Sequence, residues 1–303
     1  LNKLWNASRF VLMNLEEELP NTLPTNLTSA DKWILSKVNT LAKDVEENME
    51  GYELGLAAQK VHDFLWDEYC DWYIEMVKPR LYNKEDDSRT AALWTLKTVL
   101  ISALKLLHPF MPFITEELFL NIQTEEESIV ISEWPGFKQE WAFTENEKEI
   151  DIIKEAVRNI RNIRAEMNVA PSKKAQVFVV TENKEVAEVF EKAKVFFKTL
   201  SYASEVFVQA NKDNIGEDAV SVVIHNAVIY IPFAELVDIA KEVERLEKEQ
   251  QKLEKEIERV VKKLANEGFV SKAPQKVIEE EKAKEAKYRT MLTQVQERLS
   301  TLS

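Results

Sequence analysis

The feature that most constrains the fold is a heptad pattern near the end of the chain that is interrupted once. Apolar residues recur at intervals of four and three from Ile239 to Leu264, and a weaker pattern runs from Pro274 to Leu302. Neither half has enough apolar surface to be stable alone, yet each could cover the other. Gly268 suits the left-handed cap of a helix and Pro274 suits the first turn of a new one. The pattern therefore predicts an antiparallel hairpin about 40 Å long, from the rise of 1.5 Å per residue.

The rest of the chain divides into two regions with different periodicities. Residues 1–144 consist of long amphipathic stretches with short connections, which predicts a helical bundle. Residues 145–235 alternate between helical and strand patterns, which predicts a small α+β connector domain, and residues 236–303 form the hairpin arm. Only 5 Gly and 9 Pro in 303 residues agree with a mainly α fold.

Within these regions Gly, Pro and helix-capping residues indicate where the expected elements begin and end. A helix that follows Gly55 is expected to stop at Pro79, and another is expected to end at Pro109. Thr28, Ser29 or Asp31 is expected to cap a helix that begins near residue 30. Four strands are predicted at 174–181, 204–209, 219–225 and 227–233, with the last two joined at His225–Asn226 as a hairpin.

Several classes of function lack the residues that they need. The only cysteine, Cys70, permits no intramolecular disulfide and no Cys-rich zinc site, so a reducing compartment, the cytoplasm, is expected. No phosphate-cradling glycine loop occurs, and the three histidines are far apart in sequence, so neither a cofactor nor a metal is expected here. The acidic residues of 63–75 are expected to be a solvated helix face, because a hydrolase would need a nucleophile or metal motif. We find no leader pattern and no uncharged apolar run long enough to span a membrane.

The net charge of −13 is distributed unevenly. Basic and acidic residues number 14 and 27 in residues 1–150, 11 and 13 in residues 151–240, and 15 and 13 in residues 241–303. A chain this acidic is not expected to coat nucleic acid indiscriminately, because counterion release needs a basic surface. Any binding to RNA is therefore expected to be local.

Five stretches resemble the C-terminal half of bacterial valyl-tRNA synthetases, which are class I aminoacyl-tRNA synthetases. They are "NKLWNASRFVL" at 2–12, "DKWIL" at 31–35, "VHDFLWDEYCDWYIEMVKP" at 61–79, "LLHPFMPFITEELF" at 106–119 and "IRNIRAEMNVAPSKK" at 160–174. The sequence at 264–284 also resembles the turn of the C-terminal hairpin of valyl enzymes. Isoleucyl enzymes typically end in a Cys-rich zinc module, which one cysteine cannot build.

This resemblance implies an anticodon-binding helical bundle and a tRNA-binding coiled-coil arm. The parent enzyme would attach valine to its tRNA with ATP, but neither the ATP signatures nor the editing domain of the family occurs in these residues. The implied partners are the valine tRNA and the missing catalytic and editing domains, with no membrane. The alternative is a non-catalytic coiled-coil scaffold, which would be a parallel dimer without RNA affinity, whereas an intramolecular hairpin predicts a monomer.

The resemblance also suggests residues that could contact the anticodon. Trp33, beside Lys32, resembles the family position at which an aromatic side chain meets an anticodon base. The alternative is a Trp packed in the bundle core. Arg9 and Asn6 on the first helix are candidates for contacts with the same anticodon region, with a surface salt bridge or a helix cap as the alternative.

Two sets of basic residues could contact the tRNA backbone. Lys154, Arg158 and Arg161 share one stripe of the helix near 150–167, where they could meet phosphates or pair with the acidic bundle. The arm carries a larger set, which could follow the outer corner of the tRNA or form an ordinary solvated face. Its members are Lys248, Lys252, Lys255, Arg259, Lys262, Lys263, Lys272 and Lys276.

Overall fold

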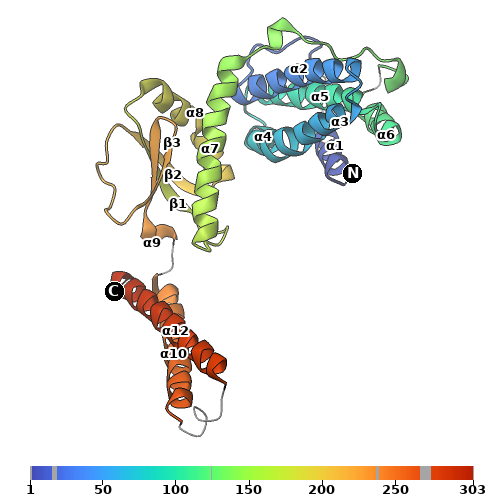
Figure 1. The fold of residues 1–303 in the computed structure, drawn as a ribbon. Coiled ribbons are helices and arrows are strands. Elements are labelled where there is room, and N and C mark those ends of the chain that lie inside the picture. Colours follow the sequence, from blue (N-terminus) through green and yellow to red (C-terminus); the bar gives the residue numbers. More distant parts are fainter. Residues whose placement is uncertain (1, 16–18, 124, 237–238, 267–273, 303) are drawn as a thin grey trace.

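The computed structural model describes residues 2–15, 19–123, 125–236, 239–266 and 274–302. The architecture is mainly α with one small mixed sheet, as the sequence predicts (Figure 1). One continuous apolar core joins the bundle to the sheet, whereas the arm has a small core of its own. Figure 1 shows the arm extending away from the rest of the molecule.

Helices α1 to α6, two 3₁₀ turns and a π-helix form the bundle. Their bounds are α1 Asn2–Asn14, α2 Ser29–Glu50, α3 Leu54–Asp63, η1 Phe64–Tyr73, α4 Ile74–Tyr82, α5 Arg89–Leu107, α6 Pro112–Ile122, η2 Ile129–Ile131 and η3 Gln139–Trp141. By length and composition α5 could cross a membrane, but 67% of its apolar window is buried in the bundle. Such burial is typical of a core helix.

The helix that follows Gly55 differs from the prediction in two ways. It does not stop at Pro79, because α4 continues to Tyr82 with Pro79 inside it. Its middle segment η1 is a π-helix, in which the Ile74 N–H donates to the Tyr69 carbonyl five residues back. Such helices are rare and frequently lie at functional sites.

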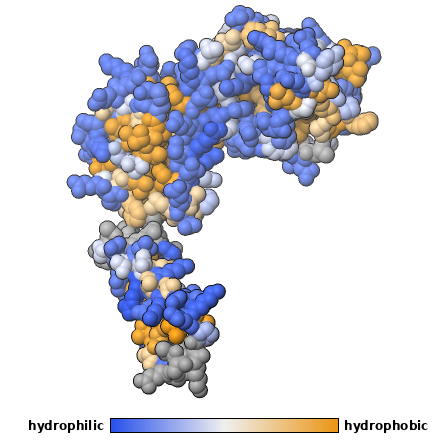
Figure 2. Space-filling model, in the orientation of Figure 1, coloured by the Kyte–Doolittle hydropathy of each residue, from blue (hydrophilic) through white to orange (hydrophobic). Residues whose placement is uncertain are grey.

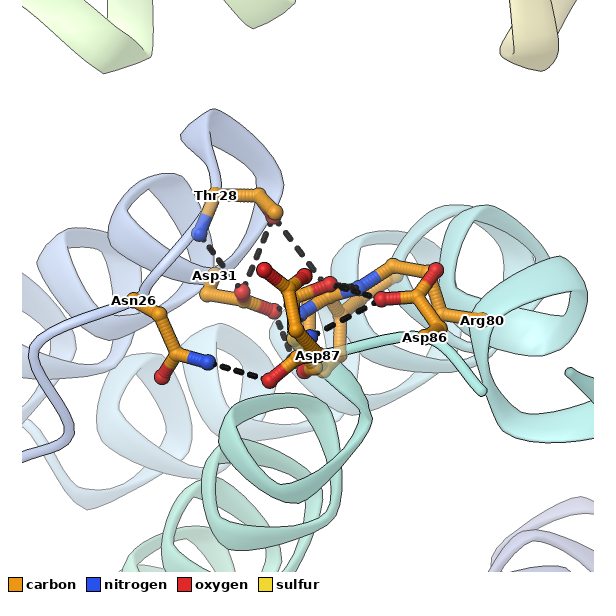
Figure 3. A network of polar contacts seen from close by, with 8 residues as sticks. Asn26, Thr28, Asp31, Arg80, Asp86 and Asp87 are labelled. Atoms are coloured by element: carbon orange, nitrogen blue, oxygen red, sulfur yellow. Dashed lines mark hydrogen bonds and ion pairs between the residues drawn. The ribbon is translucent and has the colours of Figure 1, made fainter. Parts of the chain in front are cut away.

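A buried polar network fixes the start of α2 to the end of α4 (Figure 3). Asp31 is fully buried, and its Oδ2 accepts hydrogen bonds from the backbone N and the Oγ1 of Thr28, at 2.8 and 2.9 Å. Its Oδ1 accepts from the Tyr73 hydroxyl at 2.7 Å and from Arg80 Nη1 at 2.8 Å. Arg80 Nη2 also donates to the Ser88 carbonyl at 2.7 Å. Arg80 lies just beyond Pro79, so this network helps to explain why the helix continues past the proline.

The sheet has the strand order β2-β1-β4-β3. Its strands are β1 Ala175–Val180, β2 Ala203–Gln209, β3 Val220–Ile224 and β4 Ala227–Ile231. All four strands were predicted, and β3 and β4 form the expected antiparallel hairpin, with Asn226 at a φ of 59°. Strands β1 and β2 are parallel because α8 Lys184–Leu200 connects them.

Helix α7 Thr144–Glu166 lies between the bundle and the sheet, and packs against both α2 and α8 (Figure 1). A boundary at residue 144/145 therefore assigns to one domain a helix that the two share. We retain 1–144, 145–235 and 236–303 as a proposed division of the chain.

The short helix α9 Phe233–Leu236 precedes the arm, which consists of α10 Ile239–Leu264 and α12 Gln275–Leu302. Leu246 and Leu253 pack with Val295 and Leu299, while Lys263 pairs with Glu281 at 3.1 Å. Contacts near the start of α10 are therefore made with the end of α12, so the two helices are antiparallel within one chain, as predicted. The expected turn at Gly268 lies outside the described residues.

Candidate nucleic-acid interface

The expected stacking role of Trp33 is wrong for this structure, because its side chain is fully buried. The ring lies beneath Lys154, whose Nζ is 4.9 Å from the ring centroid. No face of the indole is open to a base, so the core alternative applies. The neighbouring Lys32 is partly exposed, with its Nζ 6.0 Å from the Phe143 ring.

The outer face of α1 agrees better with the expected contact between Asn6, Arg9 and the anticodon. Asn6 and Arg9 are exposed, and neither makes an ion pair within the described part of the chain. Trp5 lies beside them and is 48% exposed. An aromatic ring, an amide and a guanidinium on one helix face are the groups that stack on unpaired bases and hydrogen-bond to their edges.

The sequence analysis did not single out Trp5 as a candidate. The buried stripe of α1 is Leu4, Ala7, Ser8 and Val11. This spacing of three and four was visible in the sequence and places Trp5 outside the stripe. The correct phase would have identified Trp5 as a solvent-facing aromatic.

The π-helix η1 packs against α1, and its side chains also contact basic side chains of α7. On the α1 side, Lys3 Nζ donates to the Trp66 carbonyl at 2.9 Å and pairs with Asp71 at 2.7 Å. On the α7 side, Trp72 lies under three basic side chains. Aromatic residues of η1 thus support basic groups of two different helices.

The α7 stripe splits into one buried and two exposed residues. Lys154 is 3% exposed and pairs with Glu68 of η1, so the expected phosphate contact is wrong for this residue and pairing with the acidic bundle is right. Arg158 and Arg161 are exposed, each with its guanidinium carbon 5.5 Å from the Trp72 centroid. Arg161 Nε also donates to the Leu200 carbonyl at 2.7 Å.

Neither Arg158 nor Arg161 pairs with a carboxylate among the residues that the structure describes. Contact with the Trp72 ring restricts both side chains, and both remain exposed to solvent. Such arginines are well suited to bind phosphate oxygens. These two residues therefore remain candidates for a backbone contact.

Arg164 is a further functional candidate that the sequence analysis did not include. It is 5% exposed, and its Nη2 donates to the carbonyls of Ala170 and Lys173 at 3.0 and 2.6 Å. Burial lowers its pKa from the usual value. Arg164 thereby holds the 167–174 loop, with the exposed Lys174, against the end of α7.

Basic residues on α10 form one continuous stripe on the solvent side of the arm. Five of the predicted residues follow each other at intervals of four and three, opposite the buried Leu246, Leu253 and Val260, and all five are exposed. They are Lys248, Lys252, Lys255, Arg259 and Lys262. The stripe extends over about 21 Å, from the helical rise per residue.

The ion pairs divide this stripe. Lys248 pairs with Glu244 at 2.6 Å and Lys262 pairs with Glu258 at 2.5 Å, and hydrogen bonds from these lysines lower the pKa of both carboxyls. In the described part of the chain the three central residues, Lys252, Lys255 and Arg259, have no carboxylate partner.

The other arm candidates lie off this stripe. Lys263 pairs with Glu281 across the hairpin, which gives it a role in the arm's own structure. Lys276 is exposed at the start of α12. Lys272 lies outside the described residues.

Comparisons with known proteins match both the region of the bundle and the arm. Residues 31–179 match the anticodon-binding domain of tRNA ligases, and residues 238–303 match the valyl-tRNA synthetase tRNA-binding arm. Valine–tRNA ligases from Clostridium perfringens and Clostridium tetani are each 50% identical over 99% of this chain. The enzyme from Bacillus anthracis is 41% identical over all of it. The chain spans about a third of the length of these relatives, 34% in each case.

Proposed function

Since the chain belongs to the valine–tRNA ligase family over the third of those enzymes that it matches, we propose that it is the tRNA-binding part of such an enzyme. The bundle would bind the anticodon region and the arm would bind the outer corner of the tRNA. The longer protein would attach valine to its tRNA with ATP, in the cytoplasm, through catalytic and editing domains outside this chain. The chain itself would act as a monomer.

The observation that carries this proposal is the set of basic residues without acidic partners in a protein of net charge −13. In the arm these are the three central residues of the α10 stripe, and in the body they include Arg9, Arg158 and Arg161. A basic side chain that already pairs with a carboxylate must give up that pair to bind a phosphate, whereas these residues need not.

The scaffold alternative is less compatible with the arm. A parallel dimer would need an apolar seam on α10, but α12 of the same chain already covers Leu246 and Leu253. The hairpin therefore leaves α10 free to present charge rather than apolar surface to a partner.

The arm is tested by replacing Lys252, Lys255 and Arg259 with Gln and measuring affinity for valine tRNA between low and moderate salt. Loss of up to three phosphate contacts should reduce the salt slope by about 2 to 3, because each contact contributes about 0.7 to 0.9. The matched control replaces Lys184, Lys192 and Lys198 of α8, which changes the net charge equally. Equal slopes in the two variants would refute the arm's role.

The α1 face is tested by Trp5→Ala in gel-shift assays with valine tRNA and an anticodon-swapped tRNA. If a base stacks on Trp5, affinity for the valine tRNA should fall by about 1–3 kcal/mol. The difference in affinity between the valine tRNA and the anticodon-swapped tRNA should become smaller at the same time. Met13→Ala is the control, because Met13 is exposed on the same helix without an aromatic ring. If Trp5→Ala left this difference in affinity unchanged, α1 would not take part in recognition of the anticodon.

A further inference from the structure

An apolar patch at the end of the bundle is not used by the proposed tRNA contacts. It consists of Phe113 and Leu120 of α6 and Val130 and Ile131 of η2, which are 90%, 42%, 70% and 71% exposed. We refer to these four residues as the α6 patch. Figure 2 shows apolar surface at this end of the bundle, over α6 and the segment that follows it.

A central carboxylate brings the four residues together. Glu116 lies on the same face of α6 as Phe113 and Leu120, at spacings of three and four residues. Its Oε2 accepts hydrogen bonds from Ser128 Oγ at 3.1 Å and from the Ile129 backbone N at 3.2 Å. This clamp holds η2 against α6, so Val130 and Ile131 extend the same surface.

Folding of the bundle does not require these side chains. The opposite face of α6 supplies the core contacts through Thr115, Leu118, Phe119 and Ile122, all of them buried. Contiguous exposed apolar surface is uncommon on monomers and marks sites of protein association. The α6 patch is therefore a candidate site of protein association.

The charges around the patch restrict which partner is possible. Exposed acidic residues flank the patch residues along the chain, namely Glu117, Glu125, Glu127 and Glu133. An RNA backbone would be repelled by these carboxylates. A symmetric contact with a second copy would place acidic residues against acidic residues. The patch fits a protein surface that has an apolar centre and basic residues around it.

We infer that the α6 patch is the docking surface for the remaining part of a valine–tRNA ligase polypeptide, an inference that rests on the proposed function. The matched relatives are about three times as long as this chain, which corresponds to their C-terminal region. In such a polypeptide the preceding segment enters through α1, and α1 packs directly against α6. The α6 patch is thus carried by a helix that contacts the element through which the chain would enter the bundle.

The test compares the 303-residue chain with a chimera in which this chain replaces the matching third of the Clostridium perfringens enzyme. Phe113→Cys is introduced into both, and the rate of maleimide labelling of that peptide is followed by mass spectrometry. Docking should slow labelling at least about tenfold in the chimera, in proportion to the fraction of molecules that remain open. The control is Tyr52→Cys, because Tyr52 is also 90% exposed but lies at the turn between α2 and α3.

Adding Val130→Asp to the chimera should restore the labelling rate of Phe113→Cys to that of the chain alone. Equal rates without that substitution would overturn the inference. A dimer of the isolated chain that Phe113→Asp or Ile131→Asp dissociates would assign the patch to a second copy instead. Weaker binding of valine tRNA to the isolated Phe113→Asp variant would assign it to RNA. Failure of the unsubstituted chain to bind tRNA at all would contradict the proposed function and leave the labelling result unaffected.

Discussion

Truncation of Trp33 separates a core role from a role in RNA binding. Trp33→Ala removes a side chain with no exposed surface in the structure. Burial of about 150–250 Å² at about 25 cal/mol per Å² gives roughly 4–6 kcal/mol, and core truncations of Trp or Phe typically cost about 3–5 kcal/mol. The variant also removes a ring that contacts the buried ammonium of Lys154. We therefore expect the free energy of unfolding of the bundle to fall by about 4 kcal/mol.

Urea unfolding followed by circular dichroism measures this loss, and gel shifts at a temperature where the variant is folded measure tRNA discrimination. Trp33→Phe is the control, because it keeps an aromatic ring and removes an indole N–H that has no hydrogen-bond partner among the described residues. Removal of the unpaired N–H offsets part of the stability lost with the side-chain volume. Trp33→Phe should therefore lower the free energy of unfolding by less than half as much as Trp33→Ala. If Trp33→Ala left stability within about 1 kcal/mol of the parent and abolished anticodon discrimination, the core assignment would be refuted.

Three further predictions concern polar groups. Asp31→Asn should destabilise the bundle by about 3 kcal/mol, since it removes the carboxylate that pairs with the largely buried Arg80 at 2.8 Å; a urea midpoint within error of the parent would contradict this. Hydrogen bonds from Lys284 and Lys263 lower the pKa of Glu281, so its contribution to arm stability should be present above about pH 4.5 and be lost as pH falls through the lower pKa of the folded state. Thermal melts of the arm should show this dependence and Glu281→Gln should remove it. Burial raises the pKa of the Cys70 thiol to about 11, so its alkylation at pH 8 should be much slower than that of the unfolded chain; equal rates would show that the thiol is open.

Much of the fold could be predicted because local patterns and tertiary structure agree. Heptad spacing with a single Gly and Pro interruption predicted the antiparallel arm, and strand alternation predicted all four strands. The continuation of α4 through Pro79 could not be predicted locally. The contacts that accompany it, from Arg80 to Asp31 and Ser88, join residues up to 49 positions apart.

The π-helix shows the limit of periodicity arguments. Its buried residues are Phe64, Leu65, Tyr69, Trp72 and Tyr73, so the steps into Tyr69 are four and five residues, whereas those beyond it are three and four. A reading based on 3.6 residues per turn assigns the faces of this segment incorrectly. The fixed hydroxyls of Tyr69 and Tyr73, bonded to the Leu96 carbonyl and to Asp31, are tertiary contacts that no local pattern contains.

The residues of the candidate site also differ in whether a local pattern or a tertiary contact determines their position. Residue type alone could not distinguish Lys154 from Arg158, because what differs is the position of Glu68 on another helix. Trp33 and Trp5 differ only in the phase of their helices relative to the core, and for Trp5 that phase was readable from Leu4, Ala7 and Val11. The sequence analysis thus lacked two kinds of information, a tertiary contact and the phase of a helix relative to the core.

In an acidic chain, where the basic residues lie is more informative than how many there are. Exposed basic residues such as Lys248 and Lys262 are already neutralised by a carboxylate one turn away. Arg158 and Arg161 contact an aromatic ring instead, and Lys252, Lys255 and Arg259 lie on one helix between the two neutralised ends. Cations without a carboxylate partner keep their full charge, so an ordered set of them can select the shape of a phosphate backbone while the net charge opposes nonspecific binding. We propose that this arrangement lets a protein of net charge −13 discriminate a folded RNA from other polyanions.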